Sequence, residues 1–247
     1  MDSLLFFIGV VGNVISVLLF ASPIKTFWRI VRRQSTEGFK ATPYIVTLLS
    51  SSLWVYYGIT KPDAYLVATV NGVGIILEAI YVALFLIFAS PPLRAETAIW
   101  VLILDVGIFG LVVAVTKLAV NGSLRILVIG SIGAFLNVLM YGSPLTLMKT
   151  VITTKSVEFM PFLLSLFLFL NGGVWTVYAI LDRDIFLGIP NGAGFLLGAA
   201  QLILYMIYKN AKVSKHLGET IEDQWQHAPL IGPNGTPAGQ SDATNQV

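Results

Sequence analysis

Seven long apolar segments, separated by short polar or turn-rich breaks, occupy most of this chain. An α-helix needs roughly 20 mostly apolar residues to cross the hydrocarbon core of a bilayer, and each segment is close to that length. They run over Leu4–Ser22, Pro43–Thr60, Tyr65–Phe88, Thr97–Lys117, Leu124–Thr146, Phe162–Leu181 and Ile185–Tyr208. The sequence therefore predicts an all-α integral membrane protein with seven transmembrane helices.

The composition agrees with a chain that is solvated largely by lipid. Only 11% of the residues are charged, whereas a soluble domain carries about 25%. A net charge of +2 argues against nucleic acid as a partner. The chain has no cysteine, and its two histidines, His216 and His227, fall in the polar C-terminal region. We therefore expect no disulfide, no metal site and no cofactor.

Lysine and arginine residues are distributed unequally between the two sides of the membrane that the seven spans define. Eleven of the 15 lie on the side that holds the loop after the first segment, and four lie on the other side. Cytosolic loops carry the excess of basic residues, so we predict a non-cytosolic N-terminus and a cytosolic C-terminus. The last residues, 211–247, are polar and rich in turn-forming types, which predicts a disordered cytosolic tail.

The polar residues between and within the segments repeat at an interval of 121 residues. The matched pairs are Ser16 with Asn137, Pro23 with Pro144, Glu37 with Glu158, Ser50 with Asn171, Trp54 with Trp175, Tyr57 with Tyr178, Asp63 with Asp184 and, after a slip of one residue, Asn71 with Asn191. This pattern predicts a first triple-helix repeat over 1–92, a linker helix over 93–120 and a second triple-helix repeat over 121–210. The linker helix adds one crossing and makes the repeats parallel (3+1+3). Transporters built from repeats bind substrate near the membrane centre, between the repeats.

Several motifs in both repeats resemble the SWEET family of sugar transporters, specifically its seven-helix plant members. The motifs are Gly12–Ser16, Ser35–Phe39, Trp54–Gly58, Thr69–Gly72, Met140–Leu145, Lys155–Phe162 and Ile189–Gly192. The resemblance extends from about residue 5 to residue 210, and within the family it is strongest to the vacuolar-type subgroup. It implies passive, bidirectional sugar transport by alternating access, with a pocket between the repeats and a gate on each side.

The resemblance places two symmetric pairs in the sugar pocket: Trp54 with Trp175, and Asn71 with Asn191. An indole face suits the apolar face of a sugar ring, and a carboxamide both donates and accepts hydrogen bonds with hydroxyl groups. Other interpretations exist for each pair. Tryptophan also forms interfacial aromatic belts, and asparagine also joins packed membrane helices.

Three further pairs are expected to shape the pocket: Ser16 with Asn137, Leu19 with Met140, and Ser50 with Asn171. In each pair the second member is bulkier or longer. Family members that carry sucrose have small residues at the second-repeat positions, so the sequence predicts a monosaccharide substrate, glucose or fructose. This prediction depends on side-chain volume alone.

The resemblance also implies hinges and an outer gate. Pro23, Pro43, Pro144 and Pro161 form the family's hinge set around the inner gate, although Pro43 and Pro161 could simply begin their helices, where proline is tolerated. Tyr57 and Asp184 match a pair that hydrogen-bonds to close the pore. The alternative for Asp184 is a solvated loop charge.

Two carboxylates, Glu78 and Asp105, lie within predicted spans, and an intramembrane carboxylate is a candidate proton relay. Neither belongs to a symmetric pair, which favours an uncoupled uniporter. The main alternative is a proton-coupled amino-acid exporter of the broader PQ-loop group, which should carry charged groups in its pocket. A seven-helix receptor is a third interpretation, but that architecture has no triple-helix repeat. The sequence also shows no cluster of nucleophile, base and metal ligand, which argues against an enzyme.

The expected partners are a small sugar, the lipid bilayer and further copies of the chain in a homo-oligomer. The resemblance favours the vacuolar membrane, with the plasma membrane as the alternative.

Overall fold

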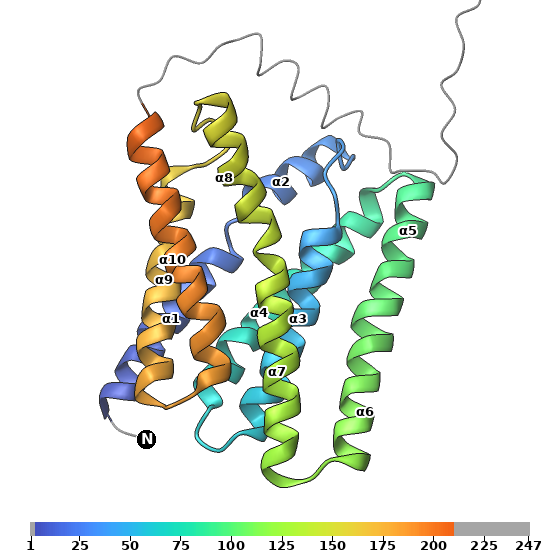
Figure 1. The fold of residues 1–247 in the computed structure, drawn as a ribbon. Coiled ribbons are helices and arrows are strands. Elements are labelled where there is room, and N and C mark those ends of the chain that lie inside the picture. Colours follow the sequence, from blue (N-terminus) through green and yellow to red (C-terminus); the bar gives the residue numbers. More distant parts are fainter. Residues whose placement is uncertain (1–2, 210–247) are drawn as a thin grey trace, which may run out of the picture. The chain divides into compact units, whose positions relative to one another are not determined.

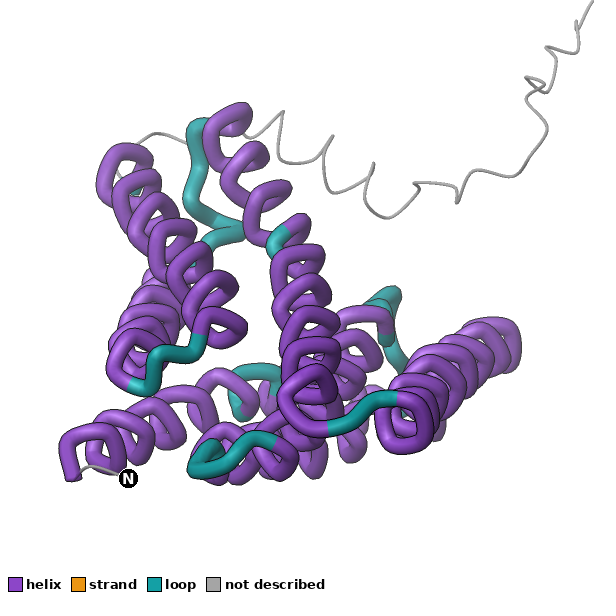
Figure 2. Tube along the Cα trace, turned by 60° about the horizontal axis from the view of Figure 1, so that its bottom comes forward, coloured by secondary structure: helices purple, strands orange, loops and turns teal. Residues whose placement is uncertain are grey.

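The computed structural model describes residues 3–209, and within this range every regular element is a helix (Figures 1 and 2). The helices are α1 Ser3–Phe20, α2 Ile24–Arg33, α3 Thr42–Thr60, α4 Tyr65–Phe88, α5 Pro91–Val101, the π-helix η1 Leu102–Ile108, α6 Phe109–Ala119, α7 Gly122–Met140, α8 Gly142–Thr154, α9 Phe162–Leu181 and α10 Ile185–Tyr208. The predicted tail, 211–247, lies outside the described residues.

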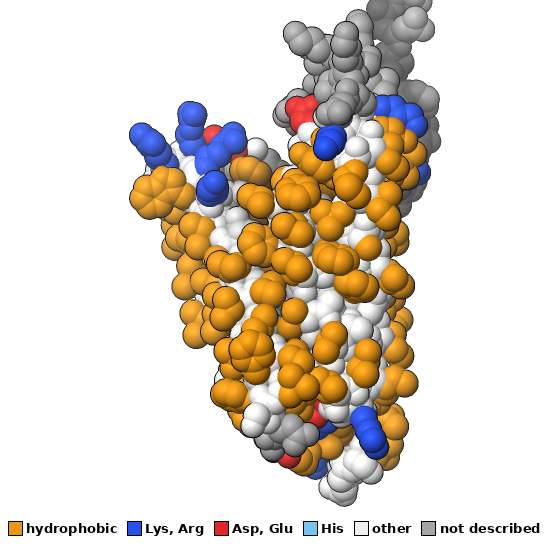
Figure 3. Space-filling model, turned by 90° about the vertical axis from the view of Figure 1, so that its left-hand side faces the viewer, with side chains coloured by type: hydrophobic (Ala, Val, Ile, Leu, Met, Phe, Trp, Pro, Cys, Tyr) orange, Lys and Arg blue, Asp and Glu red, His pale blue; other side chains and the backbone are white. Residues whose placement is uncertain are grey.

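These elements build seven membrane crossings. Six helical stretches of residues 3–209 are long and apolar enough to span a bilayer: Ser3–Arg33, Tyr65–Phe88, Pro91–Ala119, Gly122–Thr154, Phe162–Leu181 and Ile185–Tyr208. The seventh crossing is α3, which is less apolar because it carries three consecutive serines, Ser50 to Ser52. Apolar side chains cover the middle of the face shown in Figure 3, and basic side chains lie toward its ends. The chain is a multi-pass membrane protein with the predicted 3+1+3 arrangement.

The predicted ends of the first and fifth segments, Ser22 and Thr146, are wrong. In each repeat the helix bends near the proline and continues as α2 or α8, to Arg33 and Thr154. Both extensions are followed by a residue in the left-handed conformation, Gln34 (φ 53°) and Lys155 (φ 55°), 121 positions apart. These extensions are too polar to be found by hydropathy, but they obey the repeat.

The helices of each repeat pack in the same order. In the first repeat α4 contacts both α1 and α3, and in the second α10 contacts both α7 and α9. Between the repeats, α1 packs on α9 and α3 packs on α7. Because α7 and α9 are the equivalents of α1 and α3, a pseudo-twofold axis relates these two contacts. The same type of helix contact therefore occurs twice.

The linker helix, α5–η1–α6, lies at the edge of the bundle in both ribbon views (Figures 1 and 2). It begins at Pro91, earlier than the predicted Thr97, with proline in the first turn, where its missing N–H costs no helix bond. The repeat boundaries at 92/93 and 120/121 stay predictions, since contacts between helices do not fix them.

Candidate functional site

A cavity of about 320 Å³ lies between the two repeats, and all ten predicted substrate residues line it. They are Ser16, Leu19, Ser50, Trp54, Asn71, Asn137, Met140, Asn171, Trp175 and Asn191. Among the described residues that line this cavity, none is Asp, Glu, Lys, Arg or His. The site is therefore an uncharged pocket of amides, hydroxyls, indoles and aliphatic groups.

Each indole lies against a glycine of the other repeat. A methyl group on Gly12 of α1 would come 3.0 Å from the Trp175 ring, and one on Gly133 of α7 would come 3.3 Å from the Trp54 ring. Both distances are shorter than an ordinary carbon contact. Gly12 and Gly133 are 121 residues apart, so the close approach of indole to helix backbone occurs once in each half.

Serine–amide hydrogen bonds join the repeats on both sides of the cavity. Ser16 Oγ donates to Asn171 Oδ1 (2.6 Å), and Ser50 Oγ donates to Asn137 Oδ1 (2.8 Å). The first bond links α1 to α9 and the second links α3 to α7. Because each amide oxygen is occupied, the Nδ2 groups of Asn137 and Asn171 are the donors that remain for a ligand.

Asn71 and Asn191 are oriented the opposite way. Each donates Nδ2 to the backbone carbonyl four residues earlier, Val67 and Leu187 respectively, at 2.9 Å in both cases. Their Oδ1 atoms remain as acceptors. The cavity thus presents two amide donors and two amide acceptors, which together suit hydroxyl groups.

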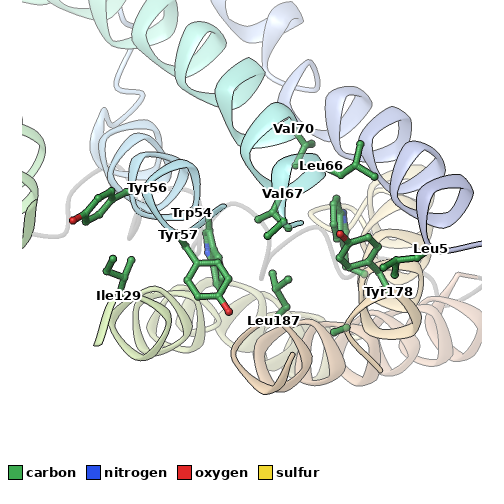
Figure 4. Close-up of a cluster of buried hydrophobic side chains, with 13 residues drawn as sticks. Leu5, Trp54, Tyr56, Tyr57, Leu66, Val67, Val70, Ile129, Tyr178 and Leu187 are labelled. Atoms are coloured by element: carbon green, nitrogen blue, oxygen red, sulfur yellow. The ribbon is translucent and has the colours of Figure 1, made fainter. Parts of the chain in front are cut away.

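Both repeats supply apolar side chains to the cavity wall. Val67 from α4 and Leu187 from α10 both line it, and Figure 4 shows them between Trp54 and Tyr57 on one side and Tyr178 on the other. These residues belong to the buried cluster that joins the repeats.

Near the α3–α4 and α9–α10 loops, the predicted gate pair is in contact. Tyr57 donates its hydroxyl to Asp184 Oδ2 (2.7 Å). Asp184 is only 4% exposed, so it is not the solvated loop charge of the alternative interpretation. Its other oxygen accepts from the backbone N–H groups of Phe186 and Leu187 and caps α10.

Lys61 and Asp182 form ion pairs beside the predicted gate pair, and the sequence reasoning missed both. Lys61 Nζ lies 2.6 Å from Asp182 Oδ2 and 2.5 Å from Asp184 Oδ2. Burial lowers the pKa of the Lys61 ammonium, but hydrogen bonds and charge from the two aspartates outweigh burial and raise that pKa above its usual value. Lys61 and Asp182 are themselves 121 residues apart, so opposite charges at equivalent positions were the available signal.

The proposed pairing of Asp63 with Asp184 is wrong. Asp184 and Ala64 both precede the first residue of a helix, α10 and α4. Asp63 (φ 61°) and Arg183 (φ 53°) both adopt the left-handed conformation. These equivalences put the extra residue of the first repeat at Pro62. Asp63 is exposed, and the Tyr178 hydroxyl has no hydrogen-bond partner among residues 3–209. The tyrosine–aspartate bond therefore forms for Tyr57 and not for its equivalent, Tyr178.

The four predicted hinge prolines lie in different settings. Pro144 lines the cavity, and Pro23 precedes α2 directly at the bend. Pro43 is in the first turn of α3 and Pro161 caps α9. The last two positions are those of ordinary helix starts, and whether these residues act as hinges stays a prediction.

Tyr141 and Gln201 line the cavity but were not predicted. Tyr141 donates its hydroxyl to the carbonyl of Pro190, which joins the end of α7 to the backbone of α10. Gln201 is a buried amide in the otherwise apolar C-terminal half of α10. An isolated polar residue in an apolar span was the signal for Gln201.

Neither Glu78 nor Asp105 lines the cavity. Glu78 is buried in α4, and its Oε2 has no partner among the described residues. Asp105 lies in η1 of the linker helix, and both its carboxylate oxygens are likewise without a partner there.

Comparison with known proteins finds one consistent group of relatives. Residues 6–93 and 127–213 match the family model described as "Sugar efflux transporter for intercellular exchange". The bidirectional sugar transporters SWEET17 and SWEET16 of Arabidopsis thaliana are 55% and 54% identical, over 89% and 86% of this chain and 92% and 93% of their own. A solved structure of a eukaryotic SWEET transporter superposes with a TM-score of 0.80 at 38% identity, covering 83% of this chain and 96% of that one.

Proposed function

Since this chain belongs to the SWEET family of sugar transporters, we propose that it moves a monosaccharide, glucose or fructose, in both directions across a membrane as an uncoupled uniporter. The observation that carries the proposal is the uncharged cavity between the repeats, with amides and indoles supplied symmetrically by both halves. Because the family consists of transporters, transport rather than catalysis is the activity that we assign to this cavity.

The chemistry of the cavity suits a neutral polyol. The free Nδ2 groups of Asn137 and Asn171 would donate to sugar hydroxyls, and the free Oδ1 groups of Asn71 and Asn191 would accept from them. The indoles of Trp54 and Trp175 supply flat apolar surface for the ring.

The size of the cavity supports a small substrate. Its volume of about 320 Å³ lies at the low end of the roughly 300–1,000 Å³ typical of small-molecule sites. Met140 lines the wall in the second repeat, and its equivalent in the first repeat, Leu19, also lines the cavity. A disaccharide would need more room.

Alternating access requires two gates that open in turn, and the structure is closed at the Tyr57–Asp184 end. The cavity wall continues toward the other end through Thr47, Pro144 and Gln201. We assign the closed end to the non-cytosolic side, in agreement with the distribution of basic residues, and we assign the bends at Pro23 and Pro144 to the movement that closes the cytosolic side.

A proton-coupled amino-acid exporter is less well supported. Such a protein needs titratable or charged groups where the substrate binds, to hold an ammonium or carboxylate group and to exchange a proton. Glu78 and Asp105 are the intramembrane carboxylates of the described chain that the sequence singled out, and both lie off the cavity.

For the location, we propose the vacuolar membrane, from the resemblance to the vacuolar-type subgroup. A fluorescent fusion expressed in plant cells tests this proposal. Fluorescence at the vacuolar membrane is expected, and fluorescence confined to the plasma membrane contradicts it.

Uptake of labelled sugars into cells that lack their own sugar transporters tests the function. We expect uptake of glucose or fructose, little uptake of sucrose, and efflux of preloaded sugar. Replacing Asn71 and Asn191 together with leucine should abolish uptake, whereas Leu196→Ala, on the exposed surface of α10, should leave it unchanged. A chain that reaches the membrane and moves neither monosaccharide contradicts the proposal.

A further inference from the structure

We propose that α2 is a binding surface for anionic phospholipid headgroups of the leaflet that it borders. This surface consists of Lys25, Trp28, Arg29, Arg32 and Arg33. It is separate from the sugar cavity, and the inference does not depend on what the cavity transports.

The inner face of α2 is fixed by packing. Phe27 and Ile30 are 2% and 0% exposed and belong to a buried cluster with residues of α4. The Phe27 ring stacks on Tyr81, with centroids 4.5 Å apart. These contacts decide which side of α2 faces outward.

The outer face of α2 is basic and carries an exposed indole. Lys25, Arg29, Arg32 and Arg33 are all exposed, and Trp28 is 71% exposed. Trp28 and the three arginines line one shallow groove on the surface.

One carboxylate only partly neutralises this face. Glu37 lies 2.5 Å from Arg29 Nε and 3.7 Å from Arg33 Nε. Lys25 and Arg32 make no ion pair within residues 3–209. Four cationic groups against one carboxylate leave a net charge of +3 along three turns of helix.

The second repeat shows that a helix at the position of α2 does not need these charges to fold. At an offset of 121, Lys25, Arg29, Arg32 and Arg33 correspond to Thr146, Thr150, Thr153 and Thr154 of α8. Each of these threonines donates its hydroxyl to a backbone carbonyl four residues earlier. α8 carries one basic residue, Lys149, at the position equivalent to Trp28, whereas α2 carries four. The dense cluster of positive charge is therefore specific to α2.

The position of α2 identifies the anion. The helix follows the first crossing after a bend at Pro23, so it starts where the chain leaves the bilayer. Figure 3 shows basic side chains toward both ends of the molecule, with the larger group at one end next to apolar surface. An exposed tryptophan favours the headgroup level of a membrane, and clustered lysine and arginine beside it attract anionic lipids. The membrane surface is the anionic partner that is always within reach.

Trp28 itself reports lipid contact. The purified full-length protein is reconstituted in vesicles of phosphatidylcholine with a fixed fraction of brominated lipid, either phosphatidylserine or phosphatidylcholine, and tryptophan fluorescence is recorded. The part of the quenching that disappears in Trp28→Phe is assigned to Trp28. We expect this part to be several-fold larger with brominated phosphatidylserine, and the preference to fall as salt is added.

Two variants separate headgroup binding from a purely topological role of the charges. Transferring the α8 residues to α2 (Lys25→Thr, Arg29→Thr, Arg32→Thr and Arg33→Thr) should remove the preference. Lys25→Thr with Arg32→Thr keeps the arginines that pair with Glu37 and should reduce it by about half. Equal quenching by the two lipids in the unmodified protein, or an unchanged preference in the fourfold variant, overturns the proposal. A third outcome also overturns the proposal: the two lipids quench Trp28 equally, and a soluble acidic peptide binds α2 in place of lipid. The partner of α2 is then a protein.

Discussion

Not all repeat-equivalent residues in the cavity make equivalent hydrogen bonds, and the two indoles show a difference. Trp175 Nε1 donates to Ser16 Oγ (2.9 Å). The residue equivalent to Ser16 is Asn137, and Trp54 Nε1 is buried with no partner among the described residues. A buried donor without a partner is a cost, whereas a satisfied one contributes to stability.

Phenylalanine at each position should therefore have unequal effects on stability. Both changes remove a similar amount of ring surface, but Trp175→Phe also removes a hydrogen bond worth about 1 kcal/mol, while Trp54→Phe removes an unpaired donor. We expect Trp175→Phe to lower the thermal unfolding midpoint of the solubilised protein more than Trp54→Phe does. Equal or reversed shifts would mean that the two indole N–H groups are in similar environments.

The volume argument for a monosaccharide can be tested directly. Asn137→Ser, Asn171→Ser and Met140→Val together should enlarge the cavity and give measurable sucrose uptake. Asn137 and Asn171 also accept hydrogen bonds from Ser50 and Ser16, so surface expression and thermal stability must be measured alongside. A folded triple variant that gains no sucrose uptake contradicts the size argument.

At the level of single residues, the sequence identified which side chains share the cavity but not how their polar atoms are used. The interval of 121 paired the residues, and the resemblance to the family assigned these pairs to the cavity. The direction of each hydrogen bond depends on distances of a few tenths of an ångström between helices, which periodicity does not encode. Lys61 and Asp182 were missed because they are charged residues in short loops, where a solvated role is the usual expectation.

Among the structural elements, the α3–α4 and α9–α10 loops carry the ion pairs of the proposed gate. Lys61 and Asp182 follow the last residues of α3 and α9, and they pair across the pseudo-twofold axis. Exchanging the two charges should therefore preserve the pair. Lys61→Asp and Asp182→Lys should each reduce the transport rate several-fold, and the double variant should recover part of it.

The double variant brings a third acid, Asp184, beside the exchanged pair, so recovery should be incomplete. A double variant no better than the worse single variant contradicts the pairing. The gate should not respond to pH through Lys61 under physiological conditions. The raised pKa of Lys61 means that its protonated form stabilises the gate at all lower pH values, and that this contribution is lost only as pH rises through the raised pKa.

Hydropathy predicted where the crossings lie but not where the helices end. It located all seven crossings, yet it ended the first and fifth at the membrane boundary. A helix can continue into water without remaining apolar, as α2 and α8 do, so an apolar pattern reports the lipid-facing part of a helix and not its full length. The repeat gave better information here, since Gln34 and Lys155 end both extensions in the same conformation.

For the whole molecule, an uncharged cavity predicts transport that is not coupled to protons or to membrane potential. Reconstituted protein should equilibrate glucose across the membrane and never accumulate it above the outside concentration, with or without an imposed proton gradient. Glu78→Gln and Asp105→Asn, in variants that remain folded, should transport at rates within about twofold of the unmodified protein, because neither carboxylate lines the cavity. Uphill accumulation driven by a proton gradient, lost in either variant, contradicts uniport.

The central claim is that one sugar binds between the two repeats, held by matching residues from each. The most direct measurement is an experimental structure with a bound monosaccharide. The account predicts the sugar ring between Trp54 and Trp175, with its hydroxyls within hydrogen-bonding distance of Asn71 and Asn191. A sugar bound elsewhere, or these four side chains facing lipid in the bound state, would contradict it.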